Sequence, residues 1–188
     1  MAASASGTKA MRRRFIVGLT IMTGLALMAG YGGWAAGLRI NTTDSMPRGV
    51  WLMERAPPHL AKGMIVVVCP PPGPAVRLAL RRRYFRNGWC KSGSEPLLKP
   101  VVAVAGDVVQ VSAAGISVDG VPVPRSALLT RDSAGRKVMP VAPGTYRVRP
   151  GQMWLASSYN PRSFDSRYFG PVPVSSVQGL ARPLWTWR

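Results

Sequence analysis

The longest apolar segment of the chain lies near its N-terminus. It runs from Phe15 to Leu38 without a charged residue, and the preceding stretch 9–14 carries four cations. A helix needs about 20 apolar residues to cross the hydrocarbon core of a bilayer, so this segment is long enough to span one. The cations predict that the N-terminal end stays in the cytoplasm, which places the rest of the chain on the far side of the membrane.

A cleavable signal peptide would begin with the same pattern. The tripeptide Gly33-Trp34-Ala35 before Ala36 offers small residues at the spacing that a processing enzyme prefers. The sequence therefore predicts an N-terminal unit, residues 1–38, that is either a signal sequence or a membrane anchor, and leaves the choice open.

After residue 39 the apolar runs become short and β-branched, and Pro and Gly separate them. Such runs are typical of strands, so residues 39–188 are expected to form one mostly β domain. The runs are Gly49–Met53, Met64–Cys69, Leu97–Ala105, Val108–Val111, Ile116–Val118, Met153–Ala156 and Val172–Leu184.

One segment departs from this pattern. Ala75–Arg86 repeats apolar residues every four positions, with arginines elsewhere around the turn, and this predicts a short helix. It belongs to a basic insertion, residues 74–90. Its arginines could contact phosphate, but an arginine-bearing helix face is more often simply solvated, so nucleic acid is not an expected partner.

Cys69 and Cys90 bracket the insertion, and they are the only cysteines of the chain. Export would place them in an oxidising compartment, where paired thiols tend to form a disulfide. Two unrelated buried thiols are the alternative.

Composition narrows the possible chemistry. The 188 residues carry 25 Lys+Arg against 7 Asp+Glu, a net charge of +18, with one histidine and two cysteines. The positive charge favours an anionic partner such as a membrane surface. A genome whose nucleotide composition favours arginine codons would produce the same excess of cations. Too few nitrogen and sulfur ligands are present for a zinc or iron–sulfur site, so no metal or cofactor is expected.

Two polar features look capable of catalysis. Ser45 lies in a polar turn, residues 41–49, directly after the apolar segment. Lys99 interrupts the otherwise apolar run 97–105, in a chain with only five lysines. Burial lowers a lysine pKa and produces a neutral amine, which can serve as the base for a serine nucleophile without histidine. Each feature alone also has a structural explanation: a strand-initiating turn, and a lysine reaching an edge of the sheet.

Three blocks in this order resemble the signature of the signal peptidase I family. They are Ser45-Met46-Pro47, then Lys99 with Val102 and Gly106-Asp107, then the eleven residues from Ser163 to Pro173. The short chain, the turn Thr42-Thr43-Asp44-Ser45 and the Lys99-Pro100 pair look most similar to its conjugative-transfer branch, the TraF-type pilin-processing peptidases. The resemblance implies a curled, signal-peptidase-like β domain.

The resemblance also implies a role for each site residue. Ser45 would be the nucleophile and Lys99 its general base, while the Ser45 amide and the Thr43 hydroxyl would form the oxyanion hole. Ser163 would orient the lysine amine. An Asp165–Arg167 pair would support the block structurally.

The implied function is that of a membrane-associated serine peptidase in the bacterial periplasm, at or anchored to the inner membrane. It would process an exported pilin precursor for plasmid transfer, with acyl transfer closing the product into a ring as one outcome, and other conjugation-apparatus proteins would be its partners. A general signal peptidase and a non-catalytic cationic scaffold at a secretion pore are the alternatives. An apolar rim would suit a lipid-facing site, unless its members are core residues: Met46, Met64, Met153, Trp185 and Trp187.

Overall fold

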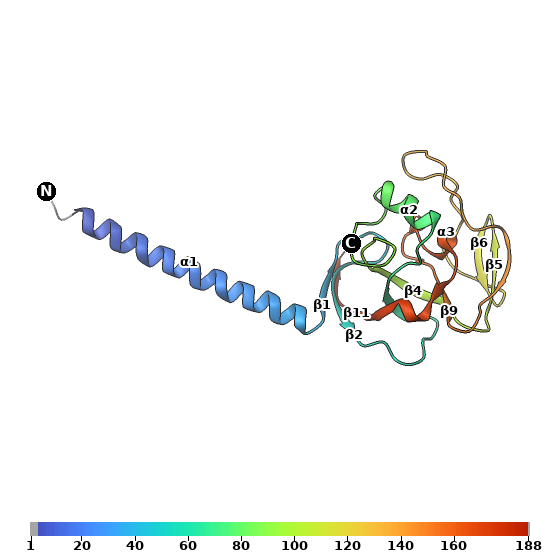
Figure 1. The fold of residues 1–188 in the computed structure, drawn as a ribbon, viewed down its shortest axis with the longest axis horizontal. Helices are drawn as coiled ribbons and strands as arrows, with labels where there is room; N and C mark the ends of the chain where they lie inside the picture. The colour runs from blue at the N-terminus through green and yellow to red at the C-terminus, as the bar shows by residue number, and fades with distance from the viewer. Residues whose placement is uncertain (1–3, 188) are drawn as a thin grey trace. The chain divides into compact units, whose positions relative to one another are not determined.

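A long helix precedes a domain built mostly of strands in the computed structural model, which describes residues 4–187 (Figure 1). The chain divides into two units, Met1–Leu38 and Arg39–Arg188. The helices are α1 (Ser4–Ala35), α2 (Pro74–Arg81), α3 (Ser166–Phe169) and the 3₁₀ helix η1 (Val174–Ser176). The strands are β1 (Leu38–Asn41), β2 (Arg48–Glu54), β3 (Ile65–Val68), β4 (Leu97–Ala103), β5 (Val108–Ser112), β6 (Gly115–Val118), β7 (Val121–Pro122), β8 (Gly144–Arg147), β9 (Gln152–Leu155), β10 (Val172–Pro173) and β11 (Val177–Trp187).

The first unit is dominated by α1. Its segment Met11–Ala35 is long and apolar enough to cross a membrane. These are properties of length and composition, which an N-terminal signal sequence shares. The apolar helix expected from the sequence is therefore present, and both roles remain compatible with it.

The second unit contains two antiparallel sheets. The larger has seven strands in the order β1-β2-β11-β3-β4-β9-β10, and the smaller has four in the order β7-β6-β5-β8. Side chains alternate along β4, where Leu97, Lys99, Val101 and Ala103 all face the buried side. The prediction of a mostly β domain is confirmed.

A two-residue turn connects two strands of the smaller sheet. Asp119 and Gly120 connect β6 to β7, and both have positive φ angles, 51° and 81°. A two-residue hairpin turn of this kind matches the twist of the flanking strands and is typical of an Asp-Gly pair. Figure 1 shows β5 and β6 on the side of the domain away from β2 and β11, so the smaller sheet stands apart from the strands that flank the Ser45 turn.

The helix of the insertion is shorter than the sequence predicted. It ends at Arg81 instead of Arg86, because Arg83 takes a left-handed φ of 59° and the chain turns back. Phe85 is then buried in the main core, with its ring 5.6 Å from that of Phe164. Burial of this aromatic side chain outweighs the helical periodicity that included Tyr84.

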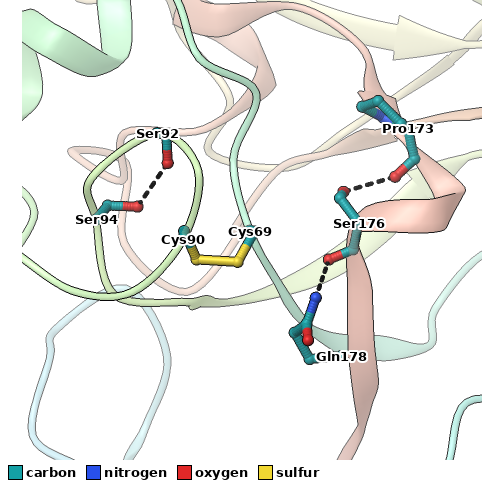
Figure 2. Close-up of a disulfide and its surroundings, with 7 residues drawn as sticks. All are labelled: Cys69, Cys90, Ser92, Ser94, Pro173, Ser176 and Gln178. Atoms are coloured by element: carbon teal, nitrogen blue, oxygen red, sulfur yellow. Dashed lines mark hydrogen bonds between the residues drawn. A yellow bond between two sulfur atoms is a disulfide. The ribbon is translucent and has the colours of Figure 1, made fainter.

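A disulfide fastens the insertion to the larger sheet. Cys69, one residue after β3, is bonded to Cys90, 21 positions later (Figure 2). On the neighbouring segment, the Ser176 hydroxyl donates to the Pro173 carbonyl, and the Ser176 carbonyl accepts from the Cys69 amide at 3.1 Å. The disulfide therefore joins the two ends of the segment that contains α2.

The C-terminal apolar run and the expected lipid-facing rim both differ from the predictions. The run 172–184 is broken by η1 into β10 and β11. Met46 and Met153 are buried and belong to the core, whereas Trp185 and Trp187 are exposed and pack against each other with ring centroids 5.2 Å apart. For Met46 and Met153 the core alternative therefore holds, whereas Met64 is half-buried.

Candidate active site

The lysine predicted to be a base lies in the interior of the domain. Lys99 belongs to β4, opposite Val66 of β3, and only 2% of its surface is exposed. Its Nζ donates to Ser163 Oγ at 2.8 Å. Burial lowers the pKa of Lys99 to about 8; the charge of Asp165 opposes this shift, while that of Arg167 adds to it. A neutral amine is therefore accessible near neutral pH.

A fully buried ion pair lies beside this lysine. Arg167 Nε and an Nη of the same guanidinium donate to the two carboxylate oxygens of Asp165, at 2.8 and 2.9 Å. The pair forms at the start of α3, where Asp165 also caps the helix by accepting from the Arg167 amide. Such a bidentate pair fixes both side chains in one orientation.

The guanidinium of Arg167 also holds the preceding loop. It donates to the main-chain carbonyls of Ser163 at 2.8 Å and Pro161 at 3.1 Å. Because Ser163 accepts from Lys99, the ion pair indirectly fixes the position of the lysine amine. The expectation that Asp165 and Arg167 pair and that Ser163 contacts the lysine agrees with this geometry.

The turn that carries Ser45 connects β1 to β2. Ser45 is half-buried, and the next residue, Met46, packs in a small buried cluster with Trp51 and Ala181. Asn41 braces the turn from within, since its Nδ2 donates to the carbonyls of Met46 and Pro47 at 3.1 and 2.9 Å. The Ser45 turn is thus held by the Asn41 side chain and by the packing of Met46.

Thr43 lies beside the Ser45 hydroxyl. The two hydroxyl oxygens are 3.4 Å apart, and Thr43 Oγ1 donates to Asn41 Oδ1 at 2.7 Å. Donation to an oxyanion would therefore require the Thr43 hydroxyl to rotate away from Asn41. The expected proximity of Thr43 to Ser45 is present, but its proton points elsewhere in this state.

The site residues form two groups. One contains Lys99, Ser163, Asp165 and Arg167, and the other centres on Ser45. Within residues 4–187, no hydrogen bond joins Ser45 to Lys99. Catalytic hydrogen bonds in substrate-free enzymes are often long and shorten when substrate binds. The lack of a Ser45–Lys99 hydrogen bond is therefore compatible with a catalytic dyad of these two residues.

Ser157 connects the two groups, although no sequence pattern predicts a role for it. Its hydroxyl donates to the main-chain carbonyl of Ser45, and its amide donates to Asp165 Oδ2 at 3.1 Å. Asn41 was likewise treated only as part of a polar turn. Single serines and asparagines in polar segments carry no periodic signal, so only the close approach of these segments reveals their roles.

The surroundings of the Ser45 turn are polar and open. In the described part of the chain, no three His, Cys, Asp or Glu side chains cluster as metal ligands. Next to the Ser45 turn is an open hollow of about 540 Å³, lined by Asp44, Arg125, Tyr159 and Asn160. This polar lining can hydrogen-bond to an extended peptide.

The chain is similar to known proteins along almost its whole length. The family model described as signal peptidase, peptidase S26, matches residues 12–187. The chain is 41% identical to a probable conjugal transfer protein TraF of Sinorhizobium fredii, over 94% of this chain and 93% of that protein. It is 40% identical to the conjugal transfer protein TraF of Agrobacterium fabrum, over 94% of this chain and 99% of that one.

A plasmid transfer protein TraF of Escherichia coli is 36% identical, over 93% of this chain and 97% of its own length. Among solved structures, a signal peptidase I from Enterococcus faecalis V583 aligns with a TM-score of 0.36 and 20% identity, covering 65% of this chain and 96% of that one.

Proposed function

The chain belongs to the peptidase S26 family of signal peptidases, and on this premise we propose that it uses Ser45 and Lys99 to process an exported pilin precursor during conjugative plasmid transfer. The observation that carries the proposal is the buried Lys99 amine, with its pKa near 8 and its bond to Ser163. A lysine kept on a buried strand face is costly for folding, and a role as proton acceptor accounts for it.

The reaction follows from the two groups. Lys99 Nζ accepts the proton of Ser45 Oγ, which attacks the scissile carbonyl of the precursor. The Ser45 amide and a rotated Thr43 hydroxyl stabilise the resulting oxyanion. The protonated lysine then gives its proton to the leaving amine, and the remaining segment is held as an ester on Ser45 until water or another amine releases it.

The assignment to plasmid transfer has a separate basis. The relatives named for conjugal or plasmid transfer match this chain along almost its whole length. The apolar helix α1 would keep the enzyme at the inner membrane, facing the periplasm, where a pilin precursor emerges. A pilin is therefore the proposed substrate, and other proteins of the transfer apparatus are the proposed partners.

The test is incubation of this protein with a candidate pilin precursor, followed by mass spectrometry. Ser45→Ala and Lys99→Arg should each leave the precursor uncut, because arginine keeps the charge but does not deprotonate. Ser158→Ala and Lys62→Arg are matched controls, since both residues are exposed, and these variants should cleave normally.

Three other results would lead to different conclusions. Full activity of Lys99→Arg would exclude the lysine base. Plasmid transfer restored equally by the unaltered protein and by Ser45→Ala would indicate a non-catalytic scaffold. Equal cleavage of the pilin precursor and of unrelated exported precursors would indicate a general signal peptidase.

A further inference from the structure

Ser157 is a buried polar residue that the proposed reaction leaves unused. It follows β9 by two positions and is fully buried. Its hydroxyl accepts from the Tyr159 amide at 3.2 Å and donates to the Ser45 carbonyl, from a segment more than 100 positions away in the sequence. A buried hydroxyl with both a donor and an acceptor partner has one defined orientation.

The backbone of Ser157 is fixed as well. Its amide donates to Asp165 Oδ2 at 3.1 Å, and that carboxylate is bonded to Arg167. A continuous path therefore runs from Arg167 through Asp165 and Ser157 to the peptide unit of Ser45. Every bond on the path is between groups that are buried or partly buried.

The same ion pair also leads to the other half of the dyad. Arg167 donates to the Ser163 carbonyl at 2.8 Å, and the Ser163 hydroxyl accepts from Lys99. One ion pair is thus connected to both Ser45 and Lys99, by two separate routes. A displacement of about 1 Å between catalytic groups can reduce a rate about 100-fold. An ion pair that positions both Ser45 and Lys99 can therefore affect the rate of the reaction.

We propose that Ser157 is a positioning residue that couples the Ser45 turn to the Asp165–Arg167 pair and thereby sets the distance from Ser45 to Lys99. This inference rests on the proposed dyad. It assigns the Ser157 hydroxyl no part in proton transfer, because its partner is a main-chain carbonyl and not the Ser45 side chain.

Ser157→Ala isolates this hydroxyl, since the bond from the amide of residue 157 to Asp165 is retained. Ser126→Ala is the matched control. Ser126 is also buried, accepts from the Ile116 amide at 3.0 Å and donates to the Val123 carbonyl at 2.6 Å, but it lies in the loop after the smaller sheet's β7. Both variants lose one buried hydroxyl with equivalent partners. Ser157→Thr, which keeps the hydroxyl, is the rescue variant.

Two measurements on the full-length chain test the proposal. The first is turnover of an internally quenched peptide that spans the cleavage site of the pilin precursor, as located by the mass spectrometry described above. Ser157→Ala should lower kcat roughly 10- to 100-fold with KM and the midpoint of the pH profile unchanged. Ser126→Ala should keep the full kcat, and Ser157→Thr should recover most of it.

The second measurement is amide hydrogen exchange of the segment 41–47, which needs no substrate. Loss of one net hydrogen bond should speed exchange there roughly five- to tenfold in Ser157→Ala, and not in Ser126→Ala. Unchanged exchange, or an equal loss of kcat in both variants, would overturn the positioning role. If the unaltered protein fails to cleave the peptide while Ser157→Ala still exchanges faster, the proposed function fails and the structural coupling stands.

Discussion

Lys99 combines a functional advantage with a cost in stability. It occupies an inward-facing position of β4 that an apolar residue would fill more favourably, and its amine is bonded to the Ser163 hydroxyl. The cost arises because burial disfavours the ammonium form. The benefit is an amine that loses its proton near pH 8 instead of 10.5.

The rate of cleavage should therefore follow the titration of this amine. Because the neutral form is the active one, kcat/KM should rise with pH through a midpoint near 8 and reach a plateau above pH 9. The measurement is a pH–rate profile of the full-length protein with a peptide substrate. A rate that continues to rise to pH 10 without a plateau would contradict a buried base.

Folding stability should change with pH in a related way. The unfolded chain keeps an ordinary lysine pKa and so binds more protons than the folded chain between pH 8 and 10.5, which means that stability rises across this window. Below pH 8 the buried ammonium lowers the free energy of unfolding by about 3 kcal/mol relative to the neutral amine. Lys99→Met should therefore be inactive but more stable at pH 7, and its advantage should shrink as the pH approaches 10.5.

Thermal unfolding of both proteins at pH 7 and pH 10 measures this difference. Lys62→Met is the control, because Lys62 is exposed and its bonds to Asp119 and Asp107 raise its pKa. This control should lose a little stability instead of gaining it. An advantage of Lys99→Met that is independent of pH would mean that apolar packing alone explains it.

At the level of single residues, the sequence was informative where a charged side chain interrupts an apolar run. Lys99 is conspicuous in an apolar run, but a lysine that reaches an edge of the sheet would give the same pattern, and only the structure shows that it is buried. The contact of Ser163 with Lys99 and the pairing of Asp165 with Arg167 followed from the resemblance to signal peptidases. Asn41 and Ser157 were missed, because their importance comes from tertiary contacts that no local pattern encodes.

At the scale of elements, strands with alternating or wholly apolar patterns were predicted well. The weak strands β1, β7 and β8 were not predicted, since all their residues are exposed or only half-buried and they contain no apolar run. The end of α2 was placed too late, because the burial of Phe85 depends on Phe164, which is distant in the sequence. Long-range packing thus decided what local periodicity left undetermined.

The disulfide is the element-level feature with the clearest test. It closes the chain from Cys69 to Cys90 at the end of β3. By the chain-entropy model, a loop of this length is stabilised by roughly 3 kcal/mol, so Cys69→Ser with Cys90→Ser should lower the unfolding temperature markedly. Activity should persist below that temperature, because the hydrogen bonds of Ser45 and Lys99 involve neither cysteine. Peptide mapping of the unaltered protein, purified without reductant, should recover the two cysteines linked; recovery of both as free thiols would contradict the pairing.

At the scale of the whole molecule, the sequence predicted an apolar N-terminal unit followed by one β domain. The charge pattern and the apolar length were sufficient for this, since both are local properties. What the sequence left open, anchor or signal sequence, is not a matter of fold: the same helix serves both roles until a peptidase cuts it.

The fate of the acyl group also concerns the whole molecule, because it depends on what reaches the ester on Ser45. Water gives a trimmed linear pilin. The amino terminus of the same pilin chain can instead attack the ester carbonyl: the ester C–O bond breaks, a peptide bond forms, and the Ser45 oxygen regains a proton that the amine loses. Well-oriented groups reach effective molarities of about 10⁵–10⁸ M, far above that of water at roughly 55 M, so a partly aligned amine can prevail.

We therefore expect pilin from donor cells to carry a mass one water lower than that of the trimmed linear chain. In the ring a peptide bond joins the two ends, whereas hydrolysis adds one water and leaves a free carboxylate and a free amine. Intact-mass spectrometry distinguishes the two products, and resistance to aminopeptidase digestion gives an independent check of the ring. Cells with Ser45→Ala should contain only the untrimmed precursor, which shows that the same serine precedes both outcomes. Recovery of the linear mass alone, in cells that transfer plasmid normally, would assign hydrolysis to this enzyme and exclude cyclisation, because an amine aligned in the site would have outcompeted water.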